Sequence, residues 1–125
     1  MLQRIAGIRI PPSREGFQVG DAIRDVGLDE VEAGLQDGSI TLVDVREPHE
    51  FAAGHIPGSV SMPLSRFDVQ SLPKEGRVVF SCAAGVRSRT AIGYCHAAGL
   101  DWSEHYPGGF KGWISAGLPV AAGDS

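Results

Sequence analysis

Short runs along the chain predict five strands, and the run over residues 78–80 is the clearest because it is β-branched and aromatic. Such runs, bounded by turn residues, are typical of buried strands. The predicted strands cover residues 23–26, 40–45, 60–62, 78–80 and 104–106. The second of these runs is apolar almost without interruption, which is typical of a strand that is buried on both faces of a parallel sheet.

Segments with helical character alternate with these strands. We predict helices over residues 29–35, 48–53 and 110–116, a helical turn over 64–68, and a helix that is capped by Ser88 or Thr90 and runs to Ala98. Early acids or a proline, and a glycine after the last turn, are typical helix boundaries. This alternation favours an α/β fold with a mainly parallel central sheet of about five strands and helices on both faces.

The length of 125 residues fits one domain with a buried core. We expect an extension over residues 1–21, a domain over 22–121 and a tail over 122–125. Three arginines precede the first acid, Glu15, which faintly resembles an organelle transit peptide. The early Pro11 and Pro12 and the scarcity of serine favour a plain extension or an added strand instead.

Composition narrows the class of protein. An apolar share of 42% fits a globular protein, and no apolar run has the length of a membrane span. The net charge of −4 gives no electrostatic reason to expect nucleic acid or an anionic membrane as a partner. Two cysteines do not suggest a disulfide framework, so we expect a reducing compartment and a cytoplasmic protein.

Cys82 stands two positions after the end of the predicted strand over residues 78–80 and before a predicted helix. In an open α/β sheet, this position at the carboxyl end of a strand is where ligands bind. The small residues 83–85 allow backbone N–H groups to converge on one point, and the helix start adds free N–H groups and the positive end of its dipole. Arg87 adds a permanent cation. The pattern predicts a cysteine nucleophile inside an anion-binding loop.

Such surroundings would ionise the thiol. A free cysteine is only about 3% ionised at neutral pH, whereas helix starts and cations lower its pKa to roughly 3.5–7.5. A shift of two units corresponds to about 2.7 kcal/mol in favour of the thiolate. The alternative is that Cys82 is a small buried hydrophobe. The hypothesis therefore requires loop amides that point at the sulfur, and a sulfur that is not sealed in an apolar interior.

The loop Cys82-Ala83-Ala84-Gly85-Val86-Arg87-Ser88 resembles the active loop of the rhodanese (sulfurtransferase) family, which has the form Cys-x-x-Gly-x-Arg-Ser. Two further stretches resemble family motifs in the same order. They are residues 43–51 with 54–59, and residues 106–113 ending in 117–120. The likeness covers roughly residues 23–120, and three ordered motifs are far more specific than one loop.

The resemblance implies a rhodanese-like fold and a sulfurtransferase with Cys82 as its catalytic residue. Ala83, Ala84, Gly85, Val86, Arg87 and Ser88 would form the substrate-binding loop, with Arg87 at its closing position. Cys82 would take a sulfane sulfur from thiosulfate or a persulfide, and a thiol, cyanide or a protein cysteine would accept it. This ping-pong chemistry needs no metal or organic cofactor, and no general base is obvious in the sequence.

Two other functions remain open. Cysteine phosphatases and arsenate reductases of the related fold place the arginine six positions after the cysteine, whereas Arg87 follows Cys82 by five. A shorter loop is better sized for a single sulfur than for a phosphate ester. A non-catalytic rhodanese-like binding or regulatory module is the other alternative, although such modules usually lose the cysteine that this chain keeps.

Other polar residues have simpler interpretations. Asp44 and Arg46 lie at a strand end near the predicted loop, where they either support the loop and meet an anion or form a local ion-pair group with Glu47 or Glu50. His55 suits a structural hydrogen bond better than proton transfer. Cys95 has core-like helical spacing, which favours a buried, inert thiol over a resolving cysteine. His49, His96 and His105 lack the spacing of metal ligands.

Overall fold

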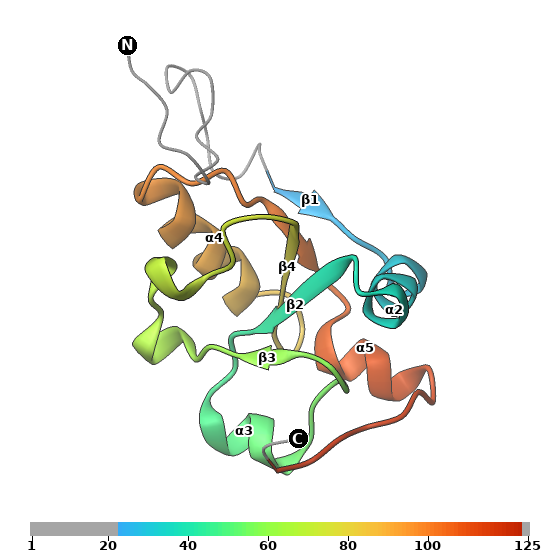
Figure 1. The fold of residues 1–125 in the computed structure, drawn as a ribbon. Coiled ribbons are helices and arrows are strands. Elements are labelled where there is room, and N and C mark those ends of the chain that lie inside the picture. The colour runs from blue at the N-terminus through green and yellow to red at the C-terminus, as the bar shows by residue number, and fades with distance from the viewer. Residues whose placement is uncertain (1–22, 124–125) are drawn as a thin grey trace.

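The computed structural model describes residues 23–123, so the predicted extension over 1–21 lies outside the described residues. Five strands form one sheet in the order β1-β5-β4-β2-β3, and all four pairings are parallel (Figure 1). The strands are β1 Arg24–Asp25, β2 Ile40–Asp44, β3 Val60–Ser61, β4 Arg77–Ser81 and β5 Glu104–Tyr106. The predicted parallel α/β sheet is therefore confirmed.

Helices lie between the strands and after the last one, within a residue or two of the predicted bounds. They are α2 Leu28–Asp37, α3 Pro48–Ala53, α4 Arg87–Ala97 and α5 Gly109–Ser115. The single turn predicted over 64–68 is instead a pair of 3₁₀ turns, Leu64–Arg66 and Val69–Ser71, which pack apolar side chains against the core. Between residues 23 and 123, no helix has the length and apolar character needed to cross a membrane.

Two apolar layers hold the sheet between the helices. Val78 and Phe80 of β4 pack with Ile92 and Cys95 of α4, whereas Val79 packs on the opposite face with the layer of α2 and α5. This alternation follows from the two-residue period of a strand. Each fully buried side chain of this size contributes about 1.5–3 kcal/mol. The helices therefore cover both faces, as the sequence predicts.

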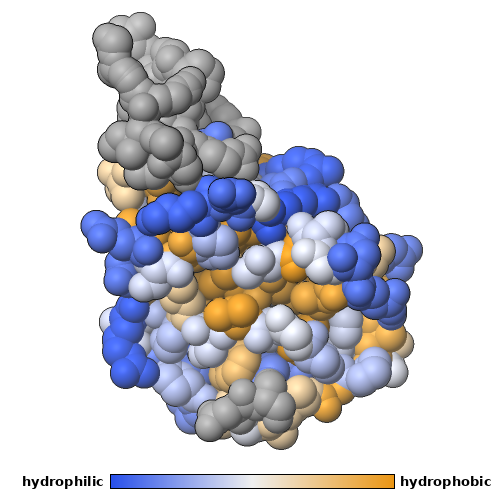
Figure 2. Space-filling model, in the orientation of Figure 1, coloured by the Kyte–Doolittle hydropathy of each residue, from blue (hydrophilic) through white to orange (hydrophobic). Residues whose placement is uncertain are grey.

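One surface of the fold leaves apolar side chains uncovered. In Figure 2, hydrophobic residues gather across the middle of the visible face and hydrophilic residues border them. The exposed apolar side chains of the described residues, on any face, include Val60 on the edge strand β3, which is 47% exposed, and Val86 in the loop before α4, which is 73% exposed.

The order of the strands determines where a site forms. The chain leaves β2 for the edge strand β3 and then returns to β4 on the other side of β2. β2 and β4 pair directly, with Asp44 opposite Ser81 at their carboxyl ends. Loops that leave neighbouring parallel strands at such a switch point diverge and leave room for a ligand. The Cys82 loop and the segment from Val45 to Glu47 are the two loops at this point.

Candidate active site

The carbonyl groups of the Cys82 loop are held by the start of α5. The N–H of Phe110 donates to the Cys82 carbonyl at 2.8 Å, and the N–H of Lys111 donates to the Ala83 carbonyl at 3.1 Å. Gly109 allows this close approach, since it has φ +62° and a Cβ there would lie 2.5 Å from both carbonyl oxygens. With these carbonyls turned toward α5, the N–H groups farther along the loop are free to face the sulfur.

Loop amides do point at the cysteine sulfur. The N–H of Gly85 donates to Cys82 Sγ at 3.1 Å, in a turn where Gly85 has φ +91° and a Cβ would lie 2.9 Å from the Pro107 carbonyl oxygen. Burial raises the pKa of the Cys82 thiol, but the hydrogen bond from the Ser88 N–H, the bond with the Ser88 hydroxyl and the bonds from the Ala84 and Gly85 N–H groups outweigh it. The pKa of this thiol is therefore lowered, as the sequence predicts.

The sulfur is nevertheless covered. Cys82 is only 1% exposed, and it belongs to the same buried cluster as Val43, Phe80 and Ala91. The sequence-based hypothesis requires a sulfur that is not sealed in an apolar interior, and this requirement is met only in part. Polar N–H and hydroxyl groups line one side of the sulfur, but a donor molecule reaches it only after the loop or a covering side chain moves.

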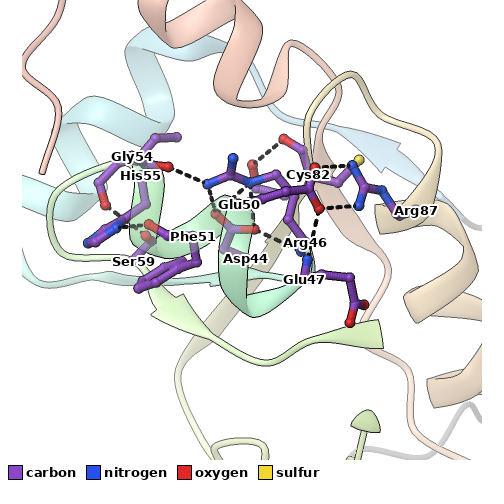
Figure 3. A network of polar contacts seen from close by, with 12 residues as sticks. Asp44, Arg46, Glu47, Glu50, Phe51, Gly54, His55, Ser59, Cys82 and Arg87 are labelled. Atoms are coloured by element: carbon purple, nitrogen blue, oxygen red, sulfur yellow. Dashed lines mark hydrogen bonds and ion pairs between the residues drawn. The ribbon is translucent and has the colours of Figure 1, made fainter. Parts of the chain in front are cut away.

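Arg87 does not close the ring of donors in the way the sequence suggests. Its guanidinium is bound by both carboxylate oxygens of Glu50, with Nη1–Oε1 at 2.7 Å and Nη2–Oε2 at 3.1 Å (Figure 3). The Glu50 carboxylate raises the pKa of Arg87, and a negative charge on Cys82 adds to this shift. Arg87 therefore supplies positive potential beside the thiol, and its hydrogen bonds go to Glu50.

Sequence reasoning named Glu50 only as a possible partner of Asp44 and Arg46 and missed its ion pair with Arg87. Glu50 also accepts a hydrogen bond from the Glu47 N–H at 2.9 Å, as part of a capping box at the start of α3. The signal in the sequence is the spacing of three residues between Glu47 at the N-cap and Glu50. Through Glu50, α3 is linked to the first residue of α4 beside the Cys82 loop.

We expect this link to depend on pH. The Arg87 guanidinium lowers the pKa of Glu50 from 4.5 to about 2. The pair therefore stabilises the fold fully above pH 4.5, and the stabilisation disappears as the pH falls toward about 2. The stability lost in Glu50→Gln should be modest, about 1 kcal/mol or less, and should vanish over this range. Urea unfolding at several pH values measures it. Equal pH dependence in wild type, Glu50→Gln and the exposed control Glu75→Gln would contradict this expectation.

Asp44 and Arg46 form a buried ion pair with each other. Arg46 Nη2 lies 2.8 Å from Asp44 Oδ2, and the two residues are 4% and 3% exposed. Arg46 also donates to the Gly54 carbonyl at 2.8 Å, and its guanidinium lies 4.4 Å from the ring centroid of Phe110. These contacts tie the end of β2 to α3 and α5 beside the loop. The local ion pair that the sequence predicts is therefore present, but it joins Asp44 to Arg46, and Glu50 feels only the more distant charge of Arg46. A role in meeting an anion stays a prediction.

The start of α4 differs from the prediction and changes the role of Ser88. The helix begins at Arg87 after Val86, with no side-chain cap, so neither Ser88 nor Thr90 is the cap. Ser88 instead lies fully buried in the first turn, where its hydroxyl contacts both Cys82 Sγ at 3.7 Å and His105 Nδ1 at 2.8 Å. The Ser88 hydroxyl therefore links the Cys82 sulfur to His105 and does not cap the helix.

The remaining cysteine and one histidine have the surroundings that the sequence indicates. Cys95 is fully buried on α4, and burial raises the pKa of its thiol to about 12. His55 is also fully buried, stacks on Phe51 with ring centroids 3.7 Å apart, and places Nδ1 2.7 Å from the Phe51 carbonyl. Cys95 is therefore a core thiol, and His55 has structural contacts around it.

Comparisons with known proteins identify the family. The family model of the rhodanese-like domain matches residues 27–116. The chain belongs to the rhodanese-like domain family. Among curated relatives, this rhodanese-like chain is 42% identical over 87 residues to an uncharacterized protein of Synechocystis, which covers 68% of the chain and 49% of that protein. It is 32% identical over 99 residues to a thiosulfate:glutathione sulfurtransferase of Saccharomyces cerevisiae, which covers 67% of the chain and 71% of that protein.

Solved structures share the fold. A human single-domain sulfurtransferase, TSTD1, is 29% identical with a TM-score of 0.62, over 73% of this chain and 95% of that one. A Rhodopseudomonas palustris protein of unknown function, described as a "possible tyrosine phosphatase", is 26% identical with a TM-score of 0.66, over 97% of this chain and 99% of that one. The chain spans about half the length of the Synechocystis relative, so relatives in this family occur in longer proteins.

Proposed function

We propose that this rhodanese-like protein is a sulfurtransferase that carries a sulfane sulfur on Cys82. The observation that supports it best is the Gly85 N–H, 3.1 Å from the Cys82 sulfur, within a loop whose donors lower the pKa of the thiol. A relative with 32% identity acts on thiosulfate and glutathione according to its name. The donor would be thiosulfate or a persulfide, and the acceptor cyanide, a thiol or a protein cysteine.

The reaction proceeds in two displacements. The Cys82 thiolate attacks the outer sulfur of thiosulfate, a Cys82 S–S bond forms, the S–S bond of thiosulfate breaks, and sulfite leaves with the electron pair. The terminal sulfur of the persulfide carries a negative charge, which the loop N–H groups and the nearby Arg87 stabilise. An acceptor such as cyanide then attacks the terminal sulfur, and thiocyanate and the Cys82 thiolate are formed.

The size of the loop favours sulfur over phosphate. Arg87 follows Cys82 by five positions, one fewer than in the cysteine phosphatases, and its guanidinium is occupied by both oxygens of Glu50. A phosphate ester would require several inward donors and a free guanidinium. A single sulfur requires only the amides that already face Cys82. The non-catalytic module is the other alternative, and the lowered pKa of Cys82 argues against it.

One pair of assays separates these functions. The protein is incubated with thiosulfate or glutathione persulfide and cyanide, and thiocyanate is measured; an aryl phosphate is tested in parallel. We expect thiocyanate with at least one donor and no release of phosphate. Hydrolysis of the aryl phosphate that disappears in Cys82→Ser would identify a phosphatase instead. Transfer from none of the donors would favour the binding module.

A further inference from the structure

A chain of hydrogen bonds runs from the cysteine sulfur to the surface. Cys82 Sγ lies 3.7 Å from Ser88 Oγ, Ser88 Oγ lies 2.8 Å from His105 Nδ1, and His105 Nε2 lies 3.1 Å from Asp25 Oδ1. The loop, α4, β5 and β1 each contribute one of these residues. Ser88 and His105 are buried, whereas the Asp25 side chain is 72% exposed. The buried thiol is therefore connected to solvent through Asp25.

The chemistry of the four groups sets the direction of the hydrogen bonds. An ionised carboxylate only accepts, so His105 Nε2 carries the hydrogen and donates to Asp25. Nδ1 of the neutral ring then accepts from the Ser88 hydroxyl. With its single hydrogen used there, the Ser88 oxygen accepts from the Cys82 thiol. Each donor in this series of hydrogen bonds thus points away from the sulfur. This is the arrangement required to remove a proton from the thiol.

We propose that Ser88, His105 and Asp25 form a proton path that takes the thiol proton of Cys82, a role that rests on Cys82 being the nucleophile. The S–H bond breaks as its proton moves to the Ser88 oxygen, and the Ser88 proton moves to His105 Nδ1. The products are a Cys82 thiolate, which accepts a hydrogen bond from Ser88, and an imidazolium that faces the Asp25 carboxylate. The proton returns along the same path after the acceptor has left, so the cycle is balanced.

The roles of the residues in this path differ. Ser88 contacts the reacting sulfur directly. His105 acts through Ser88 and is a positioning residue for the proton, and Asp25 keeps the ring in the tautomer whose Nδ1 is unprotonated. The path supplies a base that the sequence does not reveal, and it explains how a thiol that is 1% exposed exchanges its proton without direct contact with water.

The charges around His105 agree with a neutral ring in the resting protein. Strands β1 and β4 flank β5, and α4 covers the ring. Asp25 faces the ring from β1, Arg89 acts on it from α4, and Cys82 lies beyond Ser88 in the loop after β4. Burial lowers the pKa of His105 and Arg89 lowers it further, whereas Asp25 raises it. The net shift is downward, so the ring remains a proton acceptor at neutral pH.

The test is the pH profile of Cys82. The rate of alkylation by iodoacetamide and the rate of sulfur loading from thiosulfate are measured against pH for wild type, His105→Asn and Ser88→Ala. Both rates should rise with pH as Cys82 ionises. We expect this rise to occur about one pH unit higher in the variants, so that each rate is about tenfold lower on the acidic side of the profile. His96→Asn is the matched control, because His96 is a buried histidine that contacts Ser103 and lies outside this path.

The outcomes separate this proposal from the sulfurtransferase proposal. The proton path would be overturned if the pH profiles of His105→Asn match those of the wild type, or if the profiles of His96→Asn shift equally. Either result would count against the path even if sulfur transfer is active. A shifted alkylation profile without sulfur loading in any protein would support the path and contradict the transferase. If His105→Asn fails to fold, Asp25→Asn at the exposed end of the path is used, and an unshifted limb in that variant overturns the proposal.

Discussion

Replacing Cys82 by serine is expected to abolish sulfur transfer, with a loss of more than about 1,000-fold in rate. The change removes one sulfur atom and retains a group of similar shape, so the loop amides keep a partner. A serine hydroxyl, however, does not ionise at neutral pH and is a far weaker nucleophile toward sulfur than a thiolate. The measurement is thiocyanate formation from thiosulfate and cyanide under identical conditions for wild type and variant.

Cys95 provides the matched control for this substitution. It is fully buried on α4, and burial raises the pKa of its thiol to about 12, so it remains protonated. Cys95→Ser should retain the rate of transfer, with at most a loss of stability from the buried hydroxyl. Transfer that survives in Cys82→Ser, or that disappears in Cys95→Ser while the variant remains folded, would show that a different cysteine carries the sulfur.

Replacing Asp44 by alanine is expected to lower the free energy of unfolding by about 3–5 kcal/mol. Arg46 is 4% exposed, and Asp44 accepts hydrogen bonds from its Nε, Nη2 and backbone N–H. Without the carboxylate, the buried guanidinium loses its ion-pair partner and keeps, among residues 23–123, the Gly54 carbonyl, the face of Phe110 and the charge of Glu50. Urea unfolding measures the loss. An unchanged slope of the unfolding free energy against urea concentration would show that the folded and unfolded states keep their compactness.

The double variant Asp44→Ala with Arg46→Met separates the two causes of this loss. It removes the unpaired charge and fills most of the same volume with apolar atoms. We expect it to recover most of the stability that Asp44→Ala loses, because an ion pair replaced as a whole costs far less than one partner removed alone. Equal destabilisation in the single and double variants would instead attribute the loss to packing around the end of β2.

Local patterns in the sequence were sufficient for most of the fold. The bounds of α3 and β5 were predicted correctly, and for α3 the signal is clear because Pro48 and Gly54 mark its ends. The position of Cys82 at the end of β4 followed from the same reasoning. The start of α4 was predicted incorrectly, since Ser88 and Thr90 in its first turn looked like caps. The hydrogen bond of Ser88 with His105 depends on the position of β5, which sequence alone does not give.

The contacts that sequence reasoning missed join residues far apart in the chain. Glu50 and Arg87 are 37 positions apart, and Asp25 and His105 are 80 apart. The second pair meets only because β1 and β5 are neighbours in the sheet and Asp25 pairs with His105 in register. Strand order is a long-range property that single-strand patterns do not contain. The polar network around the sulfur therefore required the structure, whereas Cys82 could be singled out as the candidate nucleophile from the sequence alone.

The central claim is that the Cys82 sulfur, held by the Gly85 N–H and its neighbours, accepts a second sulfur. Intact mass spectrometry of the wild-type protein after exposure to thiosulfate or glutathione persulfide, followed by peptide mapping, tests it directly. We predict a gain of the mass of one sulfur atom, located on the peptide that contains Cys82 and absent after cyanide is added. A wild-type protein that stays unmodified with every donor, or that carries the added sulfur on Cys95, would contradict the account.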